Sequence, residues 1–316
     1  MAEAVLTTPR SAPELRPHGA AAPAPGPWTQ VRALGEMTKA RLSSLVLVTA
    51  ASGYALGLPD GLPLSYAQLG WLLLGTAFAA FGANALNQCL ERHHDAAMER
   101  TRGRPLPSGR VGLPLALVWS LSLLCGGTAL LALRSGSFAA VLALAVGVLY
   151  VAAYTPLKRR TSLATLVGAV CGALPPLIGW AAASGGELGP GAWVLFAILF
   201  VWQIPHFLAI DWYYRDDYRS GGYRMVSGVD ASGRFGGYLT VLYSLALLPI
   251  TLLAPRLGLG GALYLAGAVG LGLGLVALSV LLWVRRDRAA ARGLFLGSIV
   301  YLPLLLGLLV LDPAPL

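Results

Sequence analysis

The sequence predicts an all-α membrane protein built from nine transmembrane helices. Hydrophobic residues make up 56 % of its 316 residues and charged residues only 12 %, which is too little charge to cover the surface of a soluble domain. Nine apolar stretches follow one another along the chain, each near the roughly 20 residues that a helix needs to span a bilayer. The basic residues fall almost entirely in the segments that would share one side of the membrane, which supports this number of spans.

The spans are preceded by residues 1–35, which we expect to form a disordered cytoplasmic tail. Residues 1–30 are rich in Ala and Pro and contain no apolar run, a composition that cannot bury a core. A domain of nine transmembrane helices is expected over residues 36–312. Its predicted spans are Leu42–Leu58, Leu64–Leu86, Leu113–Leu133, Phe138–Tyr154, Leu163–Ala183, Ala192–Ile210, Tyr238–Ala254, Gly261–Val284 and Leu294–Leu311.

The positions of the 23 lysines and arginines orient these spans. All but Arg134 and Arg256 lie before the first span or in the loops that would share its side. Basic loops stay on the cytoplasmic side of a membrane, so the N-terminus is predicted to be cytoplasmic and the C-terminus, nine spans later, outside. We expect a multi-pass protein of the cell (inner) membrane. Loops facing an anionic leaflet account for the net charge of +9, so no nucleic-acid partner is expected.

The first motif that indicates a functional site lies in Asn84–Arg110, at the end of the second span and in the loop after it. Asn87, Glu91 and Asp95 are spaced i, i+4, i+8, so on a continuing helix they share one face. Stacked carboxylates repel one another unless a cation lies between them, and Mg²⁺ prefers carboxylate oxygens together with substrate phosphate. Arginines with forked donors suited to phosphate follow them, namely Arg100, Arg102 and Arg104. The alternative is a solvated loop with ordinary ion pairs.

The end of the sixth span repeats this combination of acid and base, within Trp202–Asp230. Asp216 and Asp217 stand beside Arg215. Two such clusters at the ends of even-numbered spans predict one cavity between them, on the cytoplasmic side. Asp211 lies nearer the membrane, and its position is more typical of a locally hydrogen-bonded carboxylate than of a metal ligand.

Further candidates surround the predicted cavity. Lys39 and Arg41 precede the first span, and Lys158 follows a tight break that begins at Tyr154. Lys158 is the best candidate among them for a substrate contact.

Three histidines lie near these clusters. His93 and His94 belong to the first motif, and His206 follows a proline inside the sixth span. A histidine at a helix end is more often a hydrogen-bonded structural residue than a ligand. We therefore expect structural roles for all three, with ligation of a cofactor as the alternative.

Together these segments resemble the UbiA superfamily of intramembrane prenyltransferases, over roughly residues 35–305. The first motif is similar to the family's Asn-x₃-Asp/Glu-x₃-Asp followed by MxRTxxRPL. The stretches that resemble other family motifs are Thr38–Arg41, Tyr154–Trp180 and Pro205–Met225. The last of these is similar to a block that marks the haem-farnesylating branch. Departures such as Glu91 for the commoner Asp and Leu208 for Trp remove no carboxylate of the two motifs.

The resemblance implies a UbiA-type bundle that transfers a farnesyl group from farnesyl diphosphate to a vinyl group of haem b, with addition of water and release of diphosphate. It implies Mg²⁺ held by Asn87, Glu91, Asp95, Asp216 and Asp217, of which Glu91, Asp95, Asp216 and Asp217 supply carboxylates. It implies substrate contacts from Lys39, Arg41, Arg100, Arg104, Tyr154, Lys158, Arg215 and His206. Ligation of the haem iron by His206 is a hypothesis. Haem A synthase and oxidase assembly factors are candidate partners, since the product would serve haem–copper oxidases.

Three alternatives stand beside this interpretation. Another UbiA branch would prenylate an aromatic acceptor such as 4-hydroxybenzoate. A transporter would place charge near the midplane of broken helices, whereas these carboxylates cluster at one end of the spans. A structural or assembly subunit would tolerate loss of Asp95 and Asp217.

Overall fold

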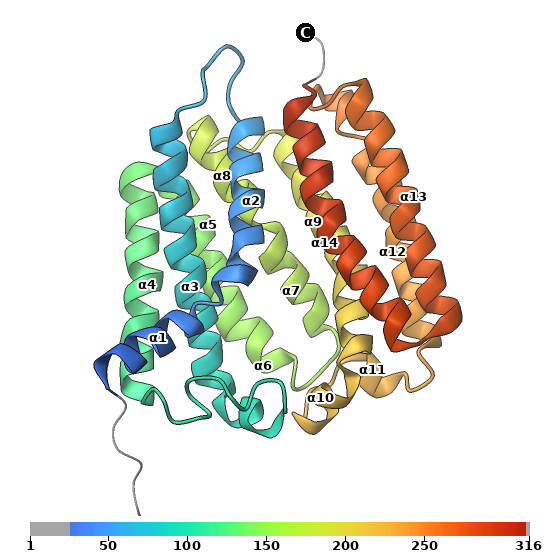
Figure 1. Cartoon of the computed structure of the whole chain (residues 1–316). Helices are drawn as coiled ribbons and strands as arrows, with labels where there is room; N and C mark the ends of the chain where they lie inside the picture. The colour runs from blue at the N-terminus through green and yellow to red at the C-terminus, as the bar shows by residue number, and fades with distance from the viewer. Residues whose placement is uncertain (1–25, 314–316) are drawn as a thin grey trace, which may run out of the picture.

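The computed structural model describes residues 26–313, and every regular element in that part of the chain is helical. The elements are α1 (Pro27–Met37), α2 (Ala40–Leu56), α3 (Tyr66–Ala97), α4 (Leu113–Arg134), α5 (Ser137–Val148), η1 (Leu149–Tyr154), α6 (Thr155–Leu157), α7 (Ala164–Ala173), α8 (Pro175–Ser184), α9 (Pro190–Tyr213), α10 (Arg215–Ser220), α11 (Val226–Val229), α12 (Arg234–Thr251), η2 (Pro255–Leu257), α13 (Ala262–Arg285) and α14 (Arg288–Leu311). They form one bundle, with the short elements at its ends (Figure 1).

Eight helical runs between residues 26 and 313 are long and apolar enough to cross a membrane. Five are the single helices α3, α4, α9, α13 and α14, and three join neighbouring elements: α5 to α6, α7 to α8, and α12 to η2. The ninth apolar helix, α2, has 17 residues, a length of about 25 Å. It packs lengthwise beside α8 within the bundle (Figure 1). These nine segments match the predicted stretches, except that α3 continues as a helix to Ala97 rather than ending at Leu86.

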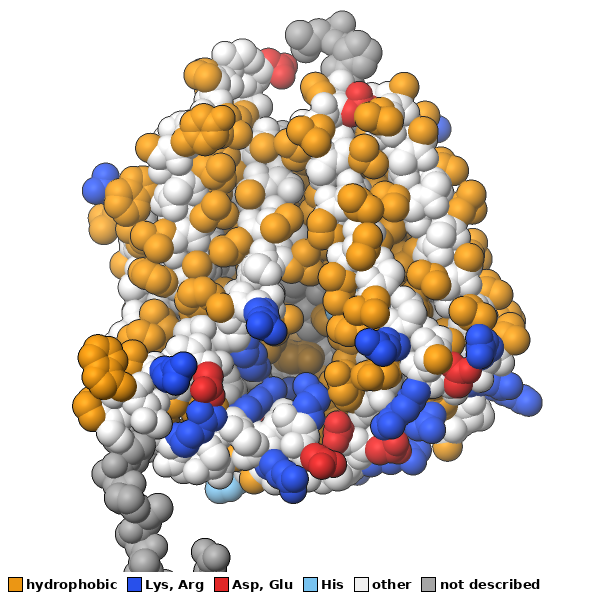
Figure 2. All heavy atoms as spheres, viewed as in Figure 1, with side chains coloured by type: hydrophobic (Ala, Val, Ile, Leu, Met, Phe, Trp, Pro, Cys, Tyr) orange, Lys and Arg blue, Asp and Glu red, His pale blue; other side chains and the backbone are white. Residues whose placement is uncertain are grey.

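Small residues let the helices approach closely, as is usual in membrane bundles. A Cβ added at Gly82 of α3 would lie 2.4 Å from the backbone nitrogen of Leu124 in α4. A Cβ at Gly127 of α4 would lie 2.4 Å from the backbone nitrogen of Ala79 in α3. The sides of the bundle carry apolar side chains, visible on the face in Figure 2. A hydrocarbon surface of this kind suits lipid contact.

The two ends of the bundle differ in charge. Lys and Arg side chains gather at the end that carries α1, α6, α10 and α11, which is the lower end in Figures 1 and 2. Arg134 at the end of α4 and Arg256 in η2 belong to the opposite end, where α14 ends at Leu311. The charge asymmetry read from the sequence is therefore an asymmetry of the folded bundle.

The predicted disordered tail needs a correction at its boundary. Residues 27–35, which we assigned to that tail, belong to the helix α1. Proline at its first position supports the helix start, and its Ala33 and Met37 are buried against Ala85 and Cys89 of α3. Helix α1 uses one apolar face to pack on the folded bundle, so the composition of residues 1–35 alone did not reveal this helix. Residues 1–25 lie outside the described part of the chain.

Candidate active site

A cavity of about 620 Å³ opens at the basic end of the bundle. Its walls come from the junction of α1 and α2, the last turns of α3, η1, the segment after α6, and α10 with the loop that follows. The lining residues are Gly35, Glu36, Lys39, Ala40, Arg41, Leu42, Asn87, Glu91, Asp95, Met98, Arg100, Arg104, Tyr150, Lys158, Tyr218 and Tyr223. Segments far apart in the sequence therefore meet around one space.

Helix α3 supplies three of the polar side chains that line the cavity. Because this helix does not end with its apolar part, Asn87, Glu91 and Asp95 fall on one face, as their spacing predicts. All three line the cavity, yet their exposed fractions are only 1 %, 2 % and 0 %. Burying a carboxylate costs several kcal/mol unless a counter-charge is close, so each needs a partner.

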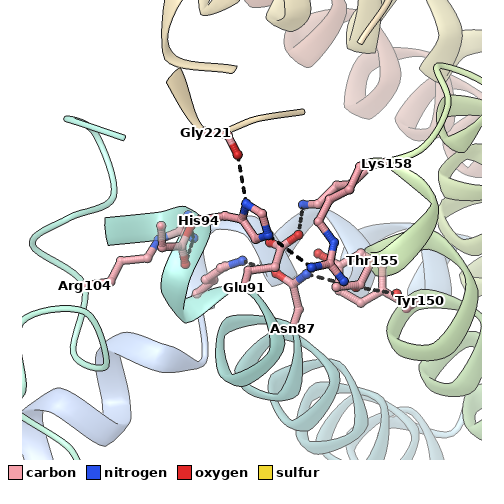
Figure 3. Close-up of polar contacts among 11 residues, drawn as sticks. Asn87, Glu91, His94, Arg104, Tyr150, Thr155, Lys158 and Gly221 are labelled. Carbon is pink, nitrogen blue, oxygen red and sulfur yellow. Dashed lines mark hydrogen bonds and ion pairs between the residues drawn. The ribbon is translucent and has the colours of Figure 1, made fainter. Parts of the chain in front are cut away.

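Each of the three residues meets a cation from another part of the chain (Figure 3). Nζ of Lys158 lies 2.6 Å from Oε1 of Glu91. Nη1 of Arg104 donates to both carboxylate oxygens of Asp95 at 2.7 Å, and Nζ of Lys39 donates to Oδ1 of Asn87 at 3.2 Å. The acids expected to hold metal and the cations expected to hold phosphate thus neutralise one another in this structure.

Lys39 reaches the cavity from a strained backbone. It has φ +50° at the break between α1 and α2, a left-handed conformation that non-glycine residues adopt only when their surroundings enforce it. Gln88 of α3 donates to the carbonyl of Met37 at 2.8 Å, and Asn84 donates to Oγ of Ser43 at 3.1 Å. These bonds fix the break against α3. Desolvation, with the positive charges of Arg104 and Lys158, lowers the pKa of Lys39 to about 7.

Lys158 is placed by the π-helical turn η1 and the short helix after it. The carbonyl of Tyr150 accepts from the hydroxyl of Thr155 at 2.7 Å, and Asn87 donates to the same hydroxyl at 3.0 Å. The Lys158 ammonium then lies between two aromatic rings, 5.3 Å from the centroid of Tyr154 and 4.9 Å from that of Tyr223. Such contacts stabilise a cation in partly desolvated surroundings.

Three tyrosines that line the cavity, Tyr150, Tyr218 and Tyr223, were not predicted from the sequence. Tyr218 and Tyr223 line the cavity from α10 and from the loop behind it. Burial raises the pKa of Tyr218 to about 12, and burial together with the charge of Glu91 raises the pKa of Tyr223. The Tyr223 hydroxyl is buried and makes no aligned hydrogen bond within the described residues. The only sequence signal was that Tyr218 and Tyr223 flank the Gly221–Gly222 turn.

His94 connects three segments at the rim of the cavity. Its Nδ1 donates to the carbonyl of Gly221 at 2.9 Å, and Arg159 donates to its Nε2 at 3.1 Å (Figure 3). The same ring packs at 5.7 Å from the ring of Tyr223. His94 is therefore a hydrogen-bonded structural residue in this structure, whereas its neighbour His93 is exposed.

The acidic pair of α10 is placed differently from the acids of α3. Asp216 has 63 % of its side chain exposed and lies 3.4 Å from Arg288 and 3.9 Å from Arg215. Asp217 is half-buried, and neither aspartate lines the cavity. Helix α9 ends at Tyr213 and α10 begins at Arg215, so the pair belongs to a new helical turn.

The remaining candidates divide between the cavity and its surroundings. Arg41 and Arg100 line it, and the Arg100 guanidinium packs 4.8 Å from the Tyr214 ring. Arg215 instead stacks on Trp212 at 4.5 Å. Asp211 is buried and accepts from the backbone nitrogen of Ser227 at 2.8 Å and from its hydroxyl, the local role that its position suggested.

Asn87, Glu91 and Asp95 offer oxygen ligands of the kind that Mg²⁺ takes. Among residues 26–313, no group of three His, Cys, Asp or Glu side chains is close enough to hold a metal. Mg²⁺ in phosphate-handling sites commonly uses one or two carboxylates and fills its other positions with water and substrate phosphate. Two buried carboxylates and an amide therefore fit an ion that substrate helps to hold.

Comparison with known proteins identifies the family of this protein. A model of the UbiA prenyltransferase family matches residues 46–302, and the chain belongs to that family.

The chain resembles several curated family members along most of its length. It is 42 % identical to a protoheme IX farnesyltransferase of Solibacter usitatus, over 88 % of this chain and 97 % of that protein. It is 45 % identical to one of Myxococcus xanthus, over 88 % of this chain and 94 % of that protein. A mitochondrial one of Arabidopsis thaliana is 39 % identical over 89 % of this chain and 64 % of that protein.

Solved structures share the architecture at low sequence identity. A digeranylgeranylglyceryl phosphate synthase superposes with a TM-score of 0.71 at 16 % identity, covering 90 % of this chain and 98 % of that one. A UbiA homolog from Archaeoglobus fulgidus bound to GPP and Mg²⁺ gives 0.57 at 14 % identity, covering 89 % and 99 %. These likenesses establish a UbiA-type bundle.

Proposed function

We propose that this protein transfers the farnesyl group of farnesyl diphosphate to a vinyl group of haem b, forming haem O. One observation carries the proposal: a buried row of Asn87, Glu91 and Asp95 faces Lys39, Arg104 and Lys158 inside a single cavity. The protoheme IX farnesyltransferases at 39–45 % identity support this acceptor over an aromatic one.

The reaction begins at the bond between C1 of the farnesyl group and the diphosphate oxygen. As that bond breaks, its electron pair moves to the diphosphate, and an allylic cation remains. A vinyl carbon of haem supplies electrons to C1, and water adds to the cation left on the vinyl group, releasing a proton. Because charge develops on the leaving diphosphate, cationic side chains held in place around it lower the barrier.

The residues of the cavity divide these tasks. Lys158, Arg104 and Lys39 would exchange their present partners on α3 for phosphate oxygens, with Arg41 and Arg100 as further contacts. The acids released by that exchange would hold Mg²⁺, which neutralises charge on the diphosphate when bound. Asp216 and Asp217 would contribute to a metal site if α10 moves toward the cavity. Tyr154 packs against Lys158 and keeps its ammonium directed at Glu91.

The bundle supplies the remaining requirements. Its apolar interior would hold the farnesyl chain away from water, which would otherwise quench the allylic cation. The excess of basic residues at the cavity end supports a cytoplasmic active-site mouth and N-terminus, with the C-terminus outside, in the cell (inner) membrane. Haem A synthase and oxidase assembly factors are the partners we propose on the basis of the product.

The decisive experiment is mass spectrometry of haem after incubation with purified protein. Haem b, farnesyl diphosphate and Mg²⁺ are supplied, and a parallel reaction contains 4-hydroxybenzoate instead of haem. The expected result is a haem product in which one vinyl group has become hydroxyethylfarnesyl, a gain of farnesyl plus hydroxyl, and which requires both Mg²⁺ and intact Asp95. Unmodified haem b beside a farnesylated aromatic acid would overturn the proposal.

A further inference from the structure

The wall shared by α9 and α14 holds a histidine that the cavity chemistry does not use. His206 lies seven residues before the end of α9 at Tyr213, about 10 Å from that end along the helix. It is half-buried, and its ring stacks on the Trp202 ring at 5.0 Å. The Phe295 ring of α14 is tilted against it, with the two ring centroids 5.4 Å apart. The imidazole is therefore held in one orientation by aromatic neighbours.

The hydrogen bonds around His206 define its tautomer. Oγ of Ser298 lies 2.7 Å from Nδ1 of His206 and 2.7 Å from the carbonyl oxygen of Phe295. A carbonyl can only accept, so the single proton of the Ser298 hydroxyl is donated to Phe295. The serine oxygen must then accept from His206, which places the imidazole proton on Nδ1. Nε2 consequently carries a free lone pair.

Nε2 of His206 makes no hydrogen bond within residues 26–313. A purely structural histidine would normally satisfy both ring nitrogens, or leave one in water. Here the free nitrogen keeps some accessible surface, and it lies on an apolar helix beside aromatic rings. A neutral imidazole with Nδ1–H donated to an oxygen and Nε2 free is the usual arrangement of a histidine that ligates a metal.

We propose that Nε2 of His206 is an axial ligand of the iron of the acceptor haem, with Ser298 and Trp202 as positioning residues. This inference rests on the proposed function for the identity of the acceptor. A haem bound there would lie against the aromatic wall of α9 and α14, beside the bundle interior rather than among the charged groups. Figure 2 shows the visible face hollowed between α2 and α14 above the basic end, which offers a flat, lipophilic ligand a way in from the side.

The assignment also gives the acceptor an orientation. If the iron is bound to a nitrogen on a rigid helix, the porphyrin can only rotate about the iron–nitrogen bond and tilt. His206 is on the same helix that leads into α10, whose Tyr218 lines the diphosphate cavity. One edge of the porphyrin would thus be directed toward the basic end, where the farnesyl C1 is expected. Holding two reactants in this way is a large part of catalysis for a reaction between them.

The test is titration of haem b into the purified full-length protein in detergent, followed by absorption and electron paramagnetic resonance spectra. The wild-type protein is expected to give the spectrum of imidazole-ligated haem. His206→Gly is expected to lose it and to bind haem at least about tenfold more weakly, and added imidazole should restore the spectrum. His206→Met should change it to that of a thioether ligand. His93→Gly, an exposed histidine on α3, is the matched control and should leave spectrum and affinity unchanged.

Ser298→Ala tests the tautomer argument. It keeps Nε2 but removes the acceptor for Nδ1–H, so the imidazole-ligand spectrum should persist with haem affinity lowered by about tenfold. A wild-type spectrum and affinity in His206→Gly would overturn the inference, as would a His206→Met protein that binds haem with the wild-type spectrum.

The two proposals can fail separately. A protein that ligates haem through His206 but yields no farnesylated haem would refute the proposed function alone. A protein that farnesylates haem with a spectrum independent of His206 would refute the ligation alone.

Discussion

The end of α3 and the segment α9–α10 contain the same kinds of residue, but they place them differently. On α3, Glu91 and Asp95 are buried and each meets a cation at 2.6–2.7 Å. On α10, Asp216 is exposed and its nearest cation, Arg288, is itself 63 % exposed. An exposed ion pair such as Asp216–Arg288 contributes about 0–1 kcal/mol to folding stability, whereas removing one partner of a buried pair costs about 3–5 kcal/mol.

The backbone explains the difference. Helix α3 runs without interruption from Tyr66 to Ala97, so its acids keep the phase set by the apolar part of the helix. Between α9 and α10 the chain leaves helical geometry at Tyr214, which has φ −108° and ψ 23°. The aspartates that follow take a new direction. A fixed acid on a continuous helix is preorganised, whereas the α10 acids can reach the cavity only if their short helix moves.

The largest effect is expected from the preorganised group. Asp95→Asn keeps the shape of the side chain but removes its charge, which leaves Arg104 without its counter-ion and weakens the proposed metal site. We expect the rate of haem farnesylation to fall by about 100-fold or more, measured by mass spectrometry of the product. Asp287→Asn is the control, on a half-buried acid away from the cavity that caps the start of α14 and whose cap an asparagine can keep, and an equal loss there would remove the contrast.

Lys158→Met should have the next largest effect. It keeps the packing between the rings of Tyr154 and Tyr223 but leaves Glu91 buried without its cation. We expect binding of inorganic diphosphate, measured by calorimetry with Mg²⁺ present, to weaken by about tenfold or more, because a charge-assisted contact is lost. The double variant with Glu91→Gln should regain thermal stability but not diphosphate binding. Unchanged diphosphate affinity in Lys158→Met would contradict the assignment.

Substitutions in α10 test whether that helix joins the site. Asp217→Asn is expected to raise the Mg²⁺ concentration needed for half-maximal activity by about tenfold, because one carboxylate ligand would be lost. Asp216→Asn should change it by less than about threefold, since this side chain is exposed and already paired at the surface. If both variants lose as much activity as Asp95→Asn, α10 closes onto the bound substrate. The difference between the two regions would then exist only in the substrate-free protein.

The smallest effect is expected from the titration of Lys39. Its pKa of about 7 lies below the ordinary value, so the amine is charged below pH 7 and neutral above it. Diphosphate binds the charged amine, and its affinity should therefore fall by a few-fold between about pH 6 and 8. Lys39→Arg stays charged over that range and should flatten the profile. A profile of the same slope in both proteins would show that another group titrates.

The sequence was sufficient for the fold and for half of the site. Apolar length and one-sided charge predicted nine helical segments, and the i, i+4, i+8 spacing placed Asn87, Glu91 and Asp95 together because a helix has a fixed period. The orientation of Asp216 and Asp217 depended on where α9 breaks, and no proline or glycine marks Tyr214. Helix ends of this kind are decided by tertiary contacts, here by packing that a periodic pattern does not encode.

The partners of the acids could not be predicted either. The sequence offered many cations near the membrane surface, but it could not pair Lys158 with Glu91 or Arg104 with Asp95. Those pairs depend on distances between elements separated by tens of residues. Tyr223 was missed for the same reason, because aromatic residues near a membrane surface are common and only folding brings this one beside Lys158.

The π-helical turn η1 makes the site sensitive to the length of the chain as well as to its composition. A π-turn holds more residues than an α-turn, so it shifts the angular phase of everything after it. If the same six residues were α-helical instead, the residues that follow would be rotated by about 100°. Lys158 would then leave Glu91, although no side chain of the cavity had changed. Deleting Val151 removes the residue that the wide turn absorbs, so an α-helical run would keep Lys158 beside Glu91 and activity should be retained. Inserting one alanine after Val151 shifts the register and should abolish activity, and an active insertion would refute this dependence.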